Sequence, residues 1–257
     1  MGILVRNNKV ISAGGKILYS RVGDPFELPN LKLYLSATRM AQQTDESSVS
    51  SFTDFSVNSF HATQATSGNQ PKFDLNQFGS NTGIKFDGSN DYLSCTGGAL
   101  DIFRNINEFT VQIVAKRGVI STASSIFQAH RNLSGGIRFT IQFQADGTIY
   151  TGLRKDDSTV HNIFSYVIND LNPHFIQVTL STSNIMYMYV DGVFVQSVLT
   201  IVGNIVNTPS LNMEVGANTV SASYGSGVVN GISVNTSYSD PATIQAQYRG
   251  YLQRGYL

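Results

Sequence analysis

Strict alternation of apolar and polar residues is the feature that most restricts how this 257-residue chain can fold. Residues 137–144 read IRFTIQFQ, so that every odd position is apolar and every even position is polar. Because successive side chains of a strand point to opposite faces of a sheet, this pattern predicts a half-buried antiparallel strand. Asp146-Gly147 then predicts a tight hairpin turn into residues 148–154, because a type I′ turn needs positive φ at both central residues.

Alternation of the same period recurs in residues 109–116 and 176–180. A second predicted hairpin joins residues 185–190 to residues 193–198 through Asp191-Gly192. From residue 31 onward, the chain therefore consists mainly of strands that are apolar on one face.

Only one stretch has helical spacing. Asp240 suits an N-cap and Pro241 suits the first helical position. Ile244, Tyr248 and Tyr251 follow with the spacing of an apolar helix face, as does Leu252. One short helix at the end of a strand-rich chain predicts an all-β sandwich with that helix packed against one edge or end.

Composition excludes several classes of function. Charged residues make up 13% of the chain, against a usual value of about 25%, and the formal net charge is zero. Because the chain has no excess of positive charge, we do not expect it to bind nucleic acid. We do not expect it to insert into a membrane either, since no apolar run approaches the ~18 residues that span a bilayer. The single cysteine, Cys95, excludes an internal disulfide. The first residues lack the apolar core of a secretory signal, so folding in the cytoplasm is expected.

Residues 1–28 form a separate segment in the sequence. Short apolar pieces, separated by the turn-forming residues Asn7-Asn8 and 13–15, predict a small β ribbon or arm. A ribbon of this size is marginal alone and needs a surface to lie on. We therefore predict an assembly arm over residues 1–28, ahead of one domain over residues 29–257. The apolar contacts of the arm are expected from Ile3, Val5, Ile17 and Tyr19.

A family resemblance begins at residues 83–93, which read GIKFDGSNDYL, a strand kinked at Gly88. This segment resembles the FDG…DYL signature of laminin-G-like jelly rolls of the concanavalin A type. The chain departs from that pattern in having no tryptophan, and Gln245 stands where the last helix of the family usually carries Glu. Further segments resemble other parts of the family in the same order: residues 31–35, 58–63 with Pro71, 108–116, 174–178 with 188–192, 215–217, and 231–234 with the closing helix.

The resemblance implies a concanavalin A-like jelly roll with a C-terminal helix. A short arm ahead of such a domain, with little charge, resembles tail or capsid-surface proteins of bacteriophages. This second resemblance implies a non-enzymatic structural protein of the virion, assembled in the host cytoplasm. Its expected partners are other virion proteins, copies of itself and glycans of the host surface. The alternative is a free carbohydrate-binding module or lectin.

The carboxylates argue against glycoside hydrolysis. Retaining glycoside hydrolases hold two carboxyl groups about 5–5.5 Å apart. In glycoside hydrolases of the concanavalin A type, both carboxyl groups come from one strand. Here Glu27, Glu46, Glu108 and Glu214 lie far apart in sequence. The four histidines are scattered, so no catalytic residue is predicted.

A calcium site is one hypothesis for the bend at residues 87–91. Asp87, Asn90 and Asp91 supply the oxygen ligands that Ca²⁺ prefers. The alternative is that the two aspartates accept hydrogen bonds from nearby backbone N–H groups as Asx turns. No other cofactor is expected.

A glycan-binding face is the second site hypothesis. Arg138, Gln142 and Gln144 are expected to face outward beside Tyr150 and Arg154 of the next strand, combining planar hydrogen-bonding groups with an aromatic ring. Tyr187 and Tyr189 would add rings if they face the same way. The alternative is an ordinary polar sheet face.

Overall fold

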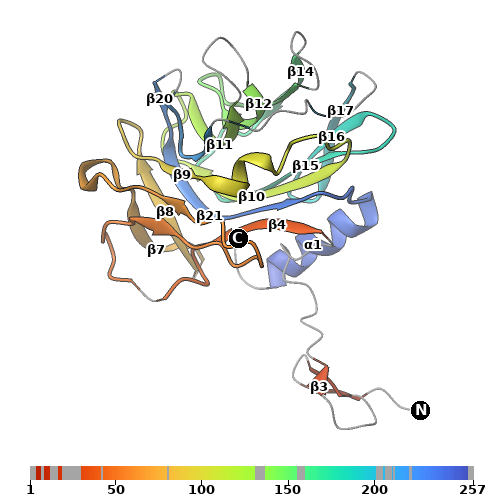
Figure 1. The fold of residues 1–257 in the computed structure, drawn as a ribbon, viewed down its shortest axis with the longest axis horizontal. Coiled ribbons are helices and arrows are strands. Elements are labelled where there is room, and N and C mark those ends of the chain that lie inside the picture. The colour runs from red at the N-terminus through yellow and green to blue at the C-terminus, as the bar shows by residue number, and fades with distance from the viewer. Residues whose placement is uncertain are drawn as a thin grey trace.

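The computed structural model describes residues 4–6, 9–11, 17–18, 30–41, 43–79, 81–130, 137–154, 160–200, 205, 210, 212–219 and 222–253. Two antiparallel eight-stranded sheets, called sheet I and sheet II here, pack against each other (Figure 1). The predicted all-β sandwich with a short C-terminal helix is confirmed, and helix α1 spans Pro241–Gln253, near the end of the chain. Among the residues described, no helix is both long and apolar enough to cross a membrane.

Sheet I is organised around β21 (Ser226–Asn235), whose first half pairs with β8 (Asn81–Asp87) and whose second half pairs with β4 (Leu31–Ser36). The other long edge of β21 pairs with β10. The strand order is β17 (Val193–Leu199), β16 (Ile185–Val190), β15 (His174–Leu180), β10 (Phe109–Arg117), β21 (Ser226–Asn235), β8 (Asn81–Asp87) and β7 (Lys72–Phe78), with β4 (Leu31–Ser36) beside β21.

Sheet II faces sheet I across the core. Its strand order is β14 (Val160–Val167), β13 (Thr148–Arg154), β12 (Ile137–Phe143), β11 (Ser124–His130), β18 (Asn212–Val215), β9 (Leu93–Cys95), β6 (Ala62–Thr63) and β5 (Ser51–Phe52). Two short 3₁₀ helices, Ser67–Asn69 and Gly97–Asp101, lie in the connections. A small hairpin of β19 (Ala217–Asn218) and β20 (Ser223–Tyr224) contacts β11.

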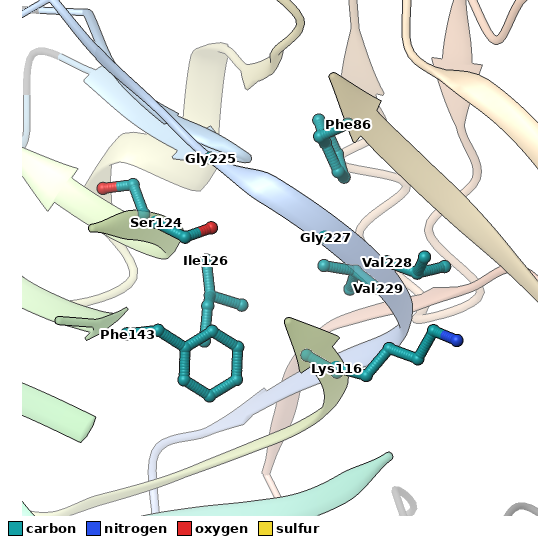
Figure 2. A pocket seen from close by; sticks show the side chains of 11 residues that line it. Phe86, Lys116, Ser124, Ile126, Phe143, Gly225, Gly227, Val228 and Val229 are labelled. Carbon is teal, nitrogen blue, oxygen red and sulfur yellow. The ribbon is translucent and has the colours of Figure 1, made fainter. Parts of the chain in front are cut away.

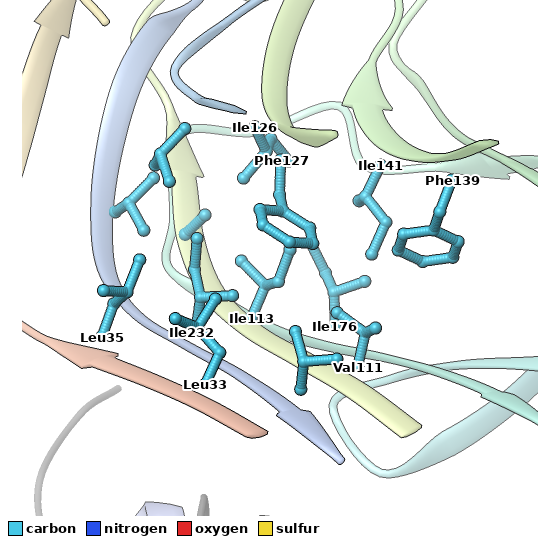
Figure 3. Packing of buried hydrophobic residues seen from close by; sticks show 14 of the residues in the cluster. Leu33, Leu35, Val111, Ile113, Ile126, Phe127, Phe139, Ile141, Ile176 and Ile232 are labelled. Carbon is cyan, nitrogen blue, oxygen red and sulfur yellow. The ribbon is translucent and has the colours of Figure 1, made fainter. Parts of the chain in front are cut away.

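The main core lies between the two sheets. Val111 and Ile113 of β10 are fully buried and face the rings of sheet II, as Figure 3 shows. Phe103 stacks on Phe139 at 5.2 Å between ring centroids, and Phe109 meets Phe139 edge-on at the same distance. The apolar members of the alternating pattern therefore point inward, as predicted, and burying their surface is the main force that holds the sheets together.

Helix α1 covers the outer face of sheet I (Figure 1), so the prediction that it packs against an edge or end of the sandwich is wrong. Asp240 caps the helix, because its Oδ1 accepts a hydrogen bond from the Thr243 N–H at 2.7 Å. Tyr251 stacks on Phe175 of β15, with ring centroids 5.1 Å apart. The helix also buries polar groups: Gln247 Oε1 accepts hydrogen bonds from the side chains of Gln112 and Gln177. The outer face of sheet I is thus partly a second, mixed core.

The two Asp-Gly hairpins differ. Asp191 and Gly192 both have positive φ, 51° and 72°, and Val190 pairs with Val193, as expected of a two-residue type I′ turn. The prediction of the same turn at Asp146-Gly147 is wrong. Only Gly147 has positive φ there, and the Gln144 N–H donates to the Thr148 carbonyl, which leaves a three-residue loop. Asp146 closes that loop by accepting the Thr148 N–H at 2.9 Å.

The predicted arm contains a ribbon of β1 (Leu4–Arg6), β2 (Lys9–Ile11) and β3 (Ile17–Leu18). Val5 pairs with Val10, and Ile17 pairs with Ile11. Within the described part of the chain, these strands pair only with one another, and Figure 1 shows β3 away from the sandwich. Ile3 and Tyr19 lie outside the described residues, and the boundary between arm and domain stays a prediction.

Candidate functional site

The glycan-binding residues predicted on β12 and β13 are only partly surface groups. Gln142 and Tyr150 are direct cross-strand partners and, like Gln144 and Arg154, are partly exposed. The expectation of an exposed Arg138 is wrong, because only 2% of its surface is accessible. Alternation correctly places Arg138 on the outer face of sheet II, but it does not tell whether other segments cover that face. Glycan binding by Gln142, Gln144, Tyr150 and Arg154 stays a prediction.

The neighbouring part of sheet II carries a buried polar cluster. Glu214 of β18 is 1% exposed, and its carboxylate accepts hydrogen bonds from the backbone and hydroxyl groups of Thr219. The Gln128 side chain donates to the Ala217 carbonyl, which fixes the β19–β20 hairpin over β11. Burial lowers the pKa of His130, on the same strand as Gln128, to about 4, so its ring is neutral at pH 7. Glu214 serves here as a hydrogen-bond acceptor in a covered structural cluster.

The bend after β8 brings together Asp87 and Asp91. Asp87 Oδ1 accepts hydrogen bonds from the N–H groups of Ser89, Asn90 and Asp91, at 2.8, 3.2 and 3.3 Å. Asp91 Oδ2 in turn accepts the Asp87 N–H at 3.1 Å. These are the hydrogen bonds expected of the Asx-turn alternative.

Burial and, next, the charge of Asp87 raise the pKa of Asp91 to about 6. In the part of the chain that the structure describes, no group of three His, Cys, Asp or Glu side chains is arranged to hold a metal ion. Calcium binding by Asp87, Asn90 and Asp91 stays a prediction.

Four aromatic side chains, which we call the tyrosine patch, gather on the outer face of sheet I. The patch consists of Tyr187 and Tyr189 of β16, Phe194 of β17 and Tyr238, which precedes α1. Phe194 contacts Tyr189 and Tyr187, with ring centroids 5.7 and 6.5 Å apart, and Tyr187 lies 6.2 Å from Tyr238. Phe194 is 53% exposed, so the patch presents an aromatic surface to solvent.

Hydroxyl groups and one carboxylate lie beside the patch, and the exposed apolar residues Val193 and Leu199 lie on the same strand as Phe194. Ser197 lies directly opposite Tyr187 in the strand register and is exposed. Burial, followed by the nearby tyrosine hydroxyls and the Asp240 carboxylate, raises the pKa of Tyr189 and Tyr238. Their phenols are therefore protonated at pH 7 and able to donate as well as accept hydrogen bonds.

The hairpin that carries the patch is held against helix α1. The Gly192 carbonyl accepts a hydrogen bond from the Gln245 side chain. A Cβ on Gly192 would lie 2.6 Å from the Tyr248 ring, so a larger residue there would push the hairpin away from the helix. The aromatic rings are consequently presented by a fixed element.

Tyr187 and Tyr189 face away from the residues predicted on β12 and β13. Met186 and Met188, which alternate with them, are buried in the core between the sheets, so the tyrosines point outward from sheet I. Gln142 and Tyr150 point outward from sheet II, on the opposite side of the sandwich. Tyr187 and Tyr189 therefore cannot add their rings to the glycan-binding face predicted on β12 and β13.

Two members of the patch were missed in the sequence. Phe194 could have been placed from the hairpin, because a two-residue turn at Asp191-Gly192 puts it opposite Tyr189. Tyr238 lies in a connection outside any periodic segment, so no local signal locates it.

Comparisons with known proteins give the fold and no family. No family model matches the chain, and no curated protein matches it in sequence. The solved structures that resemble it include the botulinum neurotoxin serotype D binding domain, at a TM-score of 0.58 and 16% identity over 88% of this chain and 52% of that one. The binding domain of botulinum neurotoxin DC in complex with SialylT gives 0.57 and 12% over 86% and 52%.

A third similar structure is Trypanosoma rangeli sialidase in complex with the inhibitor DANA, with a TM-score of 0.57 and 13% identity. That match covers 87% of this chain and 33% of the sialidase. The present chain thus spans about half, or less, of the length of the chains it matches. At these identities the likeness concerns architecture alone: the chain has a jelly-roll-like β-sandwich fold in common with these proteins.

Proposed function

We propose that the protein is a non-enzymatic, glycan-binding β-sandwich of a bacteriophage virion, displayed on the tail or the capsid surface. The observation that carries glycan binding is the tyrosine patch, in which the Phe194 ring is half exposed, Tyr187 and Tyr238 are partly exposed and Tyr189 is buried, on a chain of low charge. The similar structures support it indirectly, because they include a toxin binding domain in complex with SialylT and a sialidase with a bound inhibitor. Placement on a virion rests on the resemblance in sequence and on the arm.

The mechanism is passive. The apolar C–H face of a sugar ring stacks on Phe194 and Tyr187, while its hydroxyls exchange hydrogen bonds with Tyr238 and Ser197. Tyrosine combines a large apolar ring with one polar group and loses little conformational freedom on binding, which suits neutral polyhydroxylated ligands. The rigid hairpin against α1 keeps the rings in place before the ligand arrives.

The non-enzymatic assignment is supported by the positions of the carboxylates. Glu214 is buried within its hydrogen-bonded cluster, and Glu46 forms a surface ion pair with Lys85 at 2.9 Å. Neither lies in the tyrosine patch. We expect no turnover of β-glucans or galactans by the full-length protein.

The arm is the proposed tether. Edges of the β1–β3 ribbon can add to a strand of a sister subunit or of another virion protein through backbone hydrogen bonds. The alternative function is a free carbohydrate-binding module or lectin, in which residues 1–28 are an incidental leader. The two differ in what deletion of the arm does to assembly.

Binding is tested by titrating the full-length protein with neutral gluco- and galacto-oligosaccharides in a calorimeter. Phe194→Ala should weaken binding about 2- to 10-fold, because one aromatic contact contributes about 0.5–1.5 kcal/mol. Tyr150→Ala is the matched control, an aromatic deletion on the opposite outer face, and should leave the affinity unchanged. If Tyr150→Ala weakens binding and Phe194→Ala does not, the site is the one predicted on β12 and β13. If no oligosaccharide binds, the proposed function is wrong.

A further inference from the structure

A cleft of about 410 Å³ lies where the ends of β8, β10 and β21 meet, and none of the residues that line it belongs to the tyrosine patch. Its lining combines the side chains of Lys85, Lys116 and Gln77 with the exposed apolar side chain of Leu171. It differs from the small cavity of about 10 Å³ between Ile126, Phe143 and their neighbours, which has room for one water molecule at most (Figure 2).

The strand register places three lysines in one row across the outer face of sheet I. Lys72 of β7 pairs with Lys85 of β8, Lys85 pairs with Val228 of β21, and Val228 pairs with Lys116 of β10. Lys85 and Lys116 are therefore two strand spacings apart, about 9.5 Å at the backbone. Figure 2 shows Lys116 extending on the side of β21 that carries Val228. Like charges lined up across neighbouring strands oppose folding unless something neutralises them.

Described protein groups contact two of these lysine side chains and leave the third without a partner. Lys72 donates to Ser48 Oγ at 2.8 Å, and Lys85 pairs with Glu46 at 2.9 Å and Asp74 at 3.8 Å. The Lys116 side chain makes no hydrogen bond or ion pair with any residue of the described part of the chain. Its ammonium is available to a ligand.

The acidic residues of the cleft are already occupied. Asp87 Oδ1 accepts three backbone N–H groups of the bend that follows it. Asp74 Oδ1 accepts the Gln77 side-chain N–H at 2.7 Å, and its other oxygen faces Lys85. Asp87 stays ionised but has one oxygen held by these N–H groups, and Asp74 is paired with Lys85. An incoming anion therefore finds its cationic partner in Lys116, whose ammonium no described carboxylate pairs.

We propose that this cleft is a binding site for a carboxylate-bearing sugar, with Lys116 pairing the carboxylate, Lys85 beside it, and Leu171 against the apolar face of the ring. Uronic acids and sialic acids share this chemistry. The site is separate from the tyrosine patch, so it does not depend on the proposed function at that patch.

The test uses the full-length protein at low ionic strength, titrated with trigalacturonate, with sialyllactose and with lactose as the neutral control. At least one carboxylated sugar should bind more tightly to the cleft than lactose, and the one that does identifies the source of the carboxylate. Lys116→Gln should weaken that binding about tenfold, the loss of one charged hydrogen bond of about 1.5 kcal/mol. Lys116→Arg should restore most of it, and raising the salt concentration should weaken it.

Lys32→Gln, which removes an exposed lysine of β4 outside the cleft, is the matched control and should change nothing. Phe194→Ala should also leave this binding unchanged, which separates the cleft from the tyrosine patch. An unaltered melting temperature of Lys116→Gln verifies that the variant is folded. The proposal is overturned if neither carboxylated sugar binds more tightly than lactose, or if Lys116→Gln binds as the natural protein does.

Discussion

Phe86 of β8 shows how one residue anchors the two sheets. Its side chain is 3% exposed, and a Cβ on Gly216, between β18 and β19, would lie 2.2 Å from its ring. The ring therefore occupies the space that a glycine leaves on the opposite sheet. Glycine also suits this position because its φ is +82°.

Phe86→Ala should lower the free energy of unfolding by about 3–5 kcal/mol, through lost burial and a cavity. Phe194→Ala is the control, because its ring is half exposed and its loss should cost less than about 1 kcal/mol. Chemical denaturation measures both. A loss below about 1 kcal/mol for Phe86→Ala would contradict the inward position of this ring.

His174 is a residue whose role depends on pH. Its Nδ1 lies 2.7 Å from Asp191 Oδ2 and its Nε2 lies 3.1 Å from Asp170 Oδ1. Burial lowers the pKa of His174, but the hydrogen bonds and charges of Asp191 and Asp170 outweigh it, and the net shift is upward. Because the folded pKa is above the unfolded value of about 6.5, this contribution to stability is full below pH 6.5 and is lost as pH rises through the folded pKa.

We therefore expect the free energy of unfolding to fall with rising pH above 6.5, and this fall to be smaller in His174→Gln. His130, whose folded pKa of about 4 lies below its unfolded value, adds a slope of opposite sign near pH 6.5, but it does so equally in both proteins. Asp91, with a pKa of about 6, is almost fully ionised in both states by pH 7. Urea unfolding between pH 6.5 and 8.5 measures the slope. An equal slope in the variant would exclude this role for His174.

At the scale of the element, helix α1 depends on the buried amides that join it to sheet I. Gln247→Ala removes the acceptor of the Gln112 and Gln177 side-chain amides, which are fully buried. The expected loss is about 1–3 kcal/mol, the cost of burying donors without a partner. Gln253→Ala, at an exposed position of the same helix, controls for helix propensity and should change stability by less than about 0.5 kcal/mol. Similar losses in the two variants would show that this network does not stabilise the helix.

Strands and the helix could be predicted from the sequence because their signals are local. The alternation around Ile113 and Phe139 reports which side chains face the core, and Asp191-Gly192 reports a two-residue hairpin. What covers each outer face is decided by contacts between distant segments. For this reason the sequence does not show that Arg138 is covered, that Gln112 contacts Gln247, or that Phe194 and Tyr238 lie beside the two tyrosines of β16.

At the scale of the whole molecule, the arm and the sandwich are predicted to have separate roles. Deleting residues 1–28 should leave a soluble protein with a nearly unchanged melting temperature, because the described strands of the ribbon pair only with one another. The same deletion should abolish incorporation into particles or oligomers. Thermal unfolding and sedimentation measure the two effects. An insoluble product would make the arm part of the sandwich, and normal assembly would exclude it as the tether and favour the free lectin.

The most direct test of glycan binding is to map the bound ligand by nuclear magnetic resonance on the isotopically labelled full-length protein. Titration with the tightest-binding neutral oligosaccharide should shift the resonances of Tyr187, Phe194 and Tyr238 together, with one dissociation constant. Resonances of Gln142 and Tyr150, on the opposite face of the sandwich, should stay in place. Shifts confined to residues 142–154, or no shifts at millimolar ligand, would contradict the assignment of glycan binding to the tyrosine patch.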